Sequence, residues 1–183
     1  PADRAAQDAA NAAAAAQADR TLAEAWQSRR AYPLVVTQGD GNLGVKGKNF
    51  EMLFSIAGAG PASLKVNGTE WLWRAPRPAF WRASTDNDRG CGFPLRAAAW
   101  MAADVFVTYN GMRVLEAGPD CVKVQFQFGI PTVPGASAEL VYTVEAQGAL
   151  RVDAVYHGVA GAPELPCFGV KFETFGPVTR TVW

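Results

Sequence analysis

Apolar and polar residues alternate along most of the chain with a period of two, the pattern of strands that bury one face. The clearest case is 121–128, where Val122, Val124, Phe126 and Phe128 fall on one side and lysine and glutamine on the other. Such alternation predicts antiparallel sheets that face water on one side. Further apolar, β-branched or aromatic runs predict strands at 34–37, 50–56, 64–66, 71–73, 105–107, 139–145, 150–156 and 168–175.

Turn residues separate these runs and predict where the chain reverses. Asn67-Gly68 and Asn110-Gly111 each carry the dipeptide that favours a two-residue hairpin turn, because both positions tolerate a positive φ. The stretch 96–103 is predicted to form a short helical turn. The remaining turn signals are at 39–42, 118–120, 134–135 and 147–148. Many short strands at this spacing indicate an all-β fold, an antiparallel β-sandwich.

Residues 1–31 differ from the rest of the chain. Thirteen of the first thirty residues are alanine, which has the highest helix propensity, and Pro33 ends any helix before it. We therefore expect an alanine-rich helical linker at 1–31 and the sandwich domain at 32–183. A helix with so little apolar surface is marginal alone, so it needs a packing partner.

Composition narrows the function classes. The 183 residues carry 17 basic and 17 acidic side chains, which argues against binding to nucleic acid or to an anionic membrane surface. No apolar run is long enough to span a membrane. Three cysteines are an odd number without metal-site spacing, which is typical of reduced thiols. The start of the sequence lacks a signal-peptide pattern, so we expect a cytoplasmic protein.

The segment 79–90 holds the candidate chemistry. Its two aromatic residues are predicted to anchor the end of a strand, and its polar residues to form a rigid loop with a glycine available for positive φ. These loop residues are Asp86, Asn87, Asp88 and Gly90. In extended backbone, Asp86 and Asp88 would lie on one side about 7 Å apart, as a glycosidase acid/base pair does. The alternative is that they only cap backbone N–H groups.

Other kinds of site find less support. A calcium loop starting at Asp86 would need glutamate at its twelfth position, where the chain has Ala97. His157 is the single histidine, so a two-histidine metal site is excluded, and we interpret it as a loop residue. Sugars stack on exposed aromatic rings, and Trp73 or Trp81 could line a sugar site, although most tryptophans are core residues.

The run 76–90, PRPAFWRASTDNDRG, resembles the signature of the small-chain, or C-terminal, domain of LacZ-type β-galactosidases. Segments 47–55, 63–70 and 165–169 resemble neighbouring parts of that family, and the resemblance covers 33–183. Ser84 stands where the family usually has proline. The family also continues, beyond the point where this sequence ends, into a glycine-rich segment. The chain therefore resembles an excised first part of the domain.

The resemblance implies a supersandwich of the galactose-mutarotase type. It also implies that the catalytic glutamates and the metal sites, for Mg²⁺ and a monovalent cation, lie on a separate TIM barrel, so no cofactor is expected on this chain. Residues 90–95 would lie at the rim of the galactose pocket. Asp86, Asn87 and Asp88 would brace the loop, and Arg82 would pair with a carboxylate.

These arguments predict a non-catalytic fragment of a cytoplasmic β-galactosidase, inactive alone, that helps to shape the sugar pocket and hold the assembly together. Its partners would be the TIM barrel and the rest of the small-chain domain. The alternative is a free-standing galactoside-binding module. A third possibility is self-association into a homo-oligomer, because unpaired strand edges invite pairing with another chain.

Overall fold

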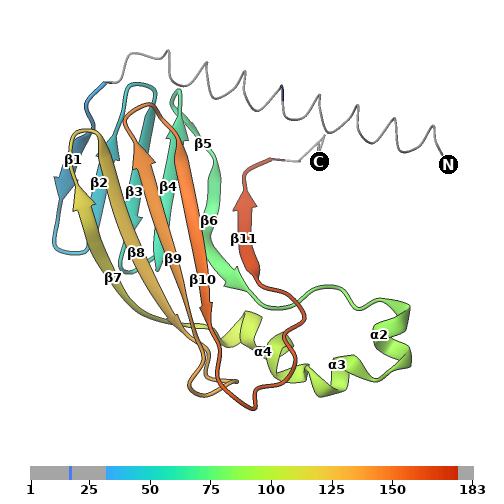
Figure 1. The fold of residues 1–183 in the computed structure, drawn as a ribbon. Helices are drawn as coiled ribbons and strands as arrows, with labels where there is room; N and C mark the ends of the chain where they lie inside the picture. The colour runs from blue at the N-terminus through green and yellow to red at the C-terminus, as the bar shows by residue number, and fades with distance from the viewer. Residues whose placement is uncertain (1–16, 18–31, 177–183) are drawn as a thin grey trace.

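The computed structural model describes Gln17 and residues 32–176, and its strands form the layers of a sandwich (Figure 1). One sheet has the order β1-β2-β3-β4-β5 and the facing sheet the order β10-β9-β8-β7. A two-stranded sheet pairs β6 (Leu72–Ala79) with β11 (Gly169–Thr174). The other strands are β1 Val35–Gln38, β2 Asn42–Lys46, β3 Phe50–Ser55, β4 Gly60–Val66, β5 Thr69–Glu70, β7 Thr108–Ala117, β8 Cys121–Gly129, β9 Ser137–Glu145 and β10 Leu150–His157.

The core lies between the two larger sheets, where the alternation of β8 predicted it. The four apolar residues of β8 are at most 2% exposed. Phe54 of the opposite sheet lies across from them, with its ring centroid 6.2 Å from that of Phe126 and 5.7 Å from that of Tyr142. All strand pairs are antiparallel. The predicted all-β sandwich is therefore confirmed.

One of the two predicted hairpins forms and the other does not. Asn67 and Gly68 have φ values of 51° and 80° and join β4 to β5, as the dipeptide predicts. The prediction for Asn110-Gly111 is wrong, because this pair lies inside β7. Tyr109 pairs with Phe128 and Gly111 with Gln127, which leaves Asn110 as an extra residue in a β-bulge.

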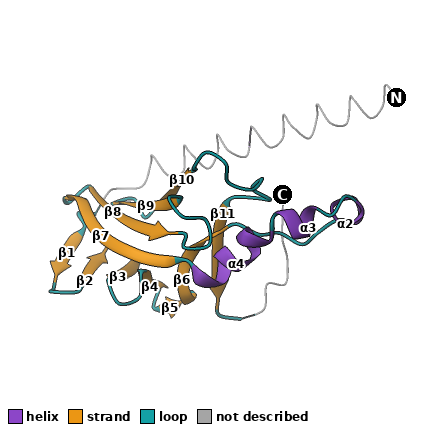
Figure 2. Ribbon diagram, turned by 90° about the horizontal axis from the view of Figure 1, so that it is seen from below, coloured by secondary structure: helices purple, strands orange, loops and turns teal. Residues whose placement is uncertain are grey.

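Three short helices follow β6: α2 (Asp86–Gly90), α3 (Phe93–Arg96) and α4 (Ala98–Phe106). In Figure 2, α2 and α3 extend as an arm beyond the sheets, while α4 lies beside the sandwich. The predicted helical turn exists but is longer, and the predicted strand at 105–107 is wrong. Trp100 and Ala103, at helical spacing, are fully buried, and this packing overrides the strand propensity of the last residues of α4.

Some predictions fall where the structure describes too little to test them. The alanine-rich linker at 1–31, Gln17 apart, and the end of the predicted domain beyond residue 176 lie outside the described residues. Within the described part, none of the helices combines the length and the apolar character that crossing a bilayer requires.

Candidate functional site

The segment 76–90, which carries the family resemblance, passes through a buried aromatic cluster at the end of β6. Phe80 is fully buried, with ring centroids 5.7 Å from Trp100, 5.8 Å from Phe168 and 6.3 Å from Tyr156. Its backbone N–H donates to Asp104 Oδ1 at 2.6 Å. The predicted anchoring of the strand end is thus confirmed for Phe80.

After this anchor, a capping box starts α2 and Arg82 braces it. Thr85 Oγ1 accepts from the backbone N–H of Asp88 at 3.2 Å, and Asp88 Oδ2 accepts from the backbone N–H of Thr85 at 2.8 Å. The Arg82 guanidinium donates to both carboxylate oxygens of Asp88, at 2.6 and 3.2 Å. Bidentate pairs of this kind set the orientation of both side chains. The predicted pairing of Arg82 with a carboxylate is confirmed.

The same geometry corrects the predicted polar loop. Asp86, Asn87, Asp88 and Gly90 all lie in the helix α2. Residues two apart in a helix point about 200° apart, so Asp86 and Asp88 do not share one side. Asp86 is 95% exposed and pairs with Arg89 instead. These two carboxylates therefore do not form the facing pair that an extended segment would have produced.

The left-handed backbone position also differs from the prediction. Gly90 has no positive φ, whereas Gly92 has φ 67° and is the N-cap of α3. The break between the two helices thus falls at Gly92, because the capping box at Thr85 has already started a regular helix through Gly90.

Hydrogen bonding controls the charge of Asp88. The Arg82 guanidinium, together with the backbone N–H of Thr85, holds the pKa of the Asp88 carboxyl well below its usual range. The same contact raises the pKa of Arg82. Asp88 is therefore ionised at every physiological pH and acts as a brace rather than as a proton donor.

Replacing Arg82 with glutamine is expected to raise the pKa of Asp88 toward its usual value of about 3.9. A lowered carboxyl pKa stabilises the fold fully above that value, and the contribution fades as the pH falls below it. The variant should therefore lose the order of α2 at a higher pH than the parent chain during acid titration. Carbon-detected NMR of the aspartate carboxyls measures both effects.

Arg89→Gln is the matched control, because it removes the neighbouring ion pair of Asp86 and leaves both partners of Asp88 in place. An unchanged pKa of Asp88 in the Arg82→Gln variant would show that the guanidinium does not set this charge.

The predicted rim segment, 90–95, spans the last residue of α2, the turn at Cys91 and Gly92, and the first three residues of α3. Phe93 is buried beneath it, while Leu95 is 86% exposed. Arg96 donates to the carbonyl of Cys91 and ties α3 back to the end of α2. The arm thus presents a fixed backbone at its outer end, with an exposed Cys91 thiol.

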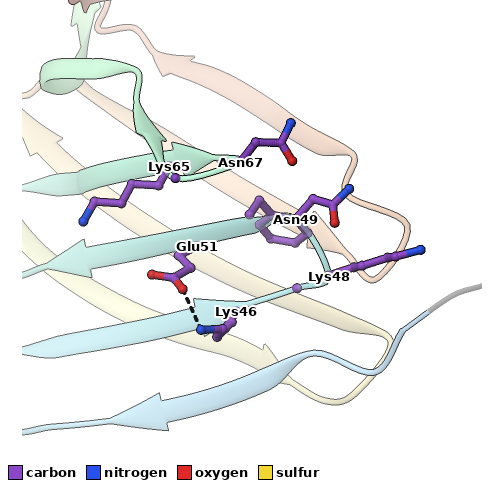
Figure 3. A pocket seen from close by; sticks show the side chains of 9 residues that line it. Lys46, Lys48, Asn49, Glu51, Lys65 and Asn67 are labelled. Atoms are coloured by element: carbon purple, nitrogen blue, oxygen red, sulfur yellow. Dashed lines mark ion pairs between the residues drawn. The ribbon is translucent and has the colours of Figure 1, made fainter.

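A hollow that the sequence did not point to lies at the end of the sandwich opposite the arm, along the ends of β2, β3 and β4 (Figure 3). It has a volume of about 430 Å³ and includes Lys46, Lys48, Asn49, Lys65 and Asn67 in its lining. Its one carboxylate, Glu51, is paired with Lys46 at 2.6 Å. In the sequence, only the lysines near the ends of these strands could have pointed to this site. The hollow, called here the lysine groove, is therefore cationic, and its one carboxylate is already paired.

Metal ligands do not gather in the described part of the chain. Among Gln17 and residues 32–176, no three His, Cys, Asp or Glu side chains converge as they would around an ion. Cys91, Cys121 and Cys167 are free thiols. His157 is the last residue of β10, with Nε2 3.3 Å from Glu139 Oε1.

One family match covers the braced arm, the lysine groove and the strands from β3 onward. The model of the beta galactosidase small chain family matches residues 46–183. The chain belongs to the β-galactosidase small-chain family. The matched region includes the end of β6 and the helix α2, where the resemblance to the family lies.

Individual relatives agree with this assignment. The β-galactosidase small subunit of Latilactobacillus sakei is 41% identical over 169 residues, which cover 82% of this small chain and 53% of the relative. The β-galactosidase of Clostridium acetobutylicum is 35% identical over 148 residues, or 81% of this chain and 16% of the relative. That of Streptococcus thermophilus is 37% identical over 140 residues. The chain thus spans about half of the first relative and a much smaller share of the others.

Proposed function

We propose that this small-chain domain is a non-catalytic part of a β-galactosidase, and that the α2–α3 arm borders the galactoside pocket formed by the rest of the enzyme. The observation that carries the proposal is the bracing of the signature segment. Arg82, Thr85 and Asp88 hold one another in a single geometry at the start of an arm that extends beyond the sheets. Such a rigid edge suits a pocket wall, because a positioned backbone contributes to binding without being ordered by the sugar.

The engagement of the nearby carboxylates supports a role in shape rather than in chemistry. The Asp88 carboxylate accepts hydrogen bonds from the Arg82 guanidinium and the backbone N–H of Thr85, and Asp86 pairs with Arg89. Asp104 accepts from the N–H of Phe80. Glycoside hydrolysis needs one carboxyl that gives up a proton and another that stays free to attack or to activate water. In the proposed enzyme both groups, with the Mg²⁺ and monovalent cation sites, belong to a TIM barrel.

The relatives support a partner as well. One of them is named a small subunit, while others are long chains in which the matched region is 14–16% of the whole. We infer that the barrel and the rest of the small-chain domain surround this domain in a cytoplasmic enzyme. The sandwich would then help to hold that assembly together.

The alternative function, a free-standing galactoside-binding module, rests on a different surface. Trp73 of β6 and Phe175, which follows β11, are both exposed, with their rings edge to face at 4.8 Å. Trp71, the residue before β6, is exposed as well, and its carbonyl accepts from the backbone N–H of Phe175. Trp73 is 57% exposed. An exposed aromatic face of this kind can stack on the apolar side of a sugar ring.

Two measurements on the purified chain separate these functions. We expect no hydrolysis of o-nitrophenyl galactoside and no heat of binding in a calorimetric titration with galactose or lactose. Turnover that persists through repeated purification would contradict the non-catalytic proposal. Millimolar or tighter binding that Trp73→Ala abolishes, and Trp81→Ala does not, would instead support the binding module.

A further inference from the structure

The helix α4 lacks a polar outer face. Its outward side chains are Ala98, Met101, Val105 and Phe106, and the last three are 54%, 70% and 61% exposed. Its one charged residue, Asp104, accepts a hydrogen bond from the backbone N–H of Phe80. A surface helix normally turns charged residues to water, and a helix that is apolar all round is normally buried.

An exposed apolar residue also occurs on α3, although the exposed Arg96 lies between it and α4 in the sequence. Only Ala97, which is fully buried, separates α4 from α3, and Leu95 on α3 is the most exposed large apolar residue of the described chain. Figure 2 shows α4, α3 and α2 following one another away from the sheets. Large apolar side chains exposed on adjacent helices are typical of a protein contact.

We propose that the α3–α4 face, formed by Leu95, Met101, Val105 and Phe106, docks on an apolar, uncharged surface of the catalytic part of the β-galactosidase. The inference rests on the proposed function, because it assigns to one partner both the pocket beside the arm and the surface against α4. The face is covalently continuous with that arm, so a partner that meets the outer end of α3 lies next to α4.

Two observations favour the catalytic part over other occupants. The relatives in which the matched region is 14–16% of the chain keep this domain inside a much larger protein, which supplies a surface to cover the helix. The rest of a small-chain domain has a different place to bind. In their sheets, β10 and β11 are outermost, and added strands pair at such edges rather than on a helix face.

Accessibility of a cysteine reporter tests the contact. Met101→Cys is placed in a Cys91→Ala background, where the remaining thiols are partly buried and burial raises the pKa of both Cys121 and Cys167, which slows their labelling. The chain is studied alone and after it replaces the matching segment of the Clostridium acetobutylicum β-galactosidase. Gln147→Cys, an exposed position in the β9–β10 turn at the other end of the sandwich, is the matched control (Figure 1).

We expect maleimide labelling at position 101 to be at least tenfold slower in the chimera than in the isolated chain, and labelling at 147 to change less than twofold. Adding Val105→Asp should restore fast labelling at 101, while the melting temperature of the isolated chain stays the same because this side chain projects into water. Equal labelling rates at 101 in the two proteins would overturn the proposal. Protection at 101 that already grows with the concentration of the isolated chain would also overturn it, in favour of a second copy.

The activity of the chimera reports separately on the proposed function. Protection at position 101 in a chimera that does not hydrolyse o-nitrophenyl galactoside would support the docking face and count against the pocket-wall role. An active chimera in which position 101 stays accessible would support the pocket-wall role and count against the docking face.

Discussion

Replacing Phe80 with alanine is expected to lower the free energy of unfolding by about 3–5 kcal/mol, the usual cost of removing a fully buried aromatic ring. Phe80 contacts three other rings, which come from α4, β10 and the segment before β11. Trp81→Ala should cost less, about 1–2 kcal/mol, because Trp81 is half-buried and removes less apolar area from water. Urea denaturation followed by far-UV circular dichroism measures both losses.

Phe80→Leu is the control for ring loss, since it keeps an apolar side chain of similar size and should retain most of the stability. The sequence does not say which of the two aromatic residues is in the core. The structure predicts the larger loss at Phe80, because Phe80 is fully buried and Trp81 is not. Equal losses at the two positions, or a larger loss at Trp81, would contradict the arrangement of the anchor.

Phe126→Ala is expected to be equally costly, about 3–5 kcal/mol, for a different part of the molecule. The ring lies between the two sheets and contacts Phe54, Tyr109 and Tyr142 at centroid distances of 6.2, 6.2 and 5.8 Å. Its loss leaves a cavity that the rigid backbones of the facing sheets cannot close. Thermal unfolding should therefore shift downward while remaining a single transition.

Gln127→Ala provides the comparison on the same strand, because the next side chain points to water and its removal should change stability by less than about 0.5 kcal/mol. If the two substitutions had similar effects, β8 would not bury the face that its alternation predicts.

The paired expectations show where sequence reasoning succeeded. Alternation in β8 predicts which side chains meet the core, since successive residues of a strand must point to opposite faces. Asn67-Gly68 predicts a reversal, because both residues tolerate the positive φ that a tight hairpin needs. Both features depend on a few adjacent residues, and both appear in the structure.

The failures have the opposite origin. The dipeptide Asn110-Gly111 has the same composition, yet it forms a bulge because β7 keeps pairing with β8 on both sides of it. Val105 and Phe106 favour strands intrinsically, yet they end a helix whose Trp100 fills the core. In both cases contacts with residues far along the chain outweighed a local preference of a few tenths to about 1 kcal/mol per residue.

For the candidate site too, local features were predicted from the sequence and long-range features were not. The sequence by itself determined the family signature, the polar character of the segment after Phe80 and the expectation that Arg82 meets a carboxylate. Only the tertiary structure decided that Asp88 is that carboxylate, that α2 points Asp86 elsewhere and that α4 keeps an apolar outer face. The physical reason is range: side-chain chemistry and backbone preference are local properties, whereas the direction of a helix follows from the distant residues that bury its other side.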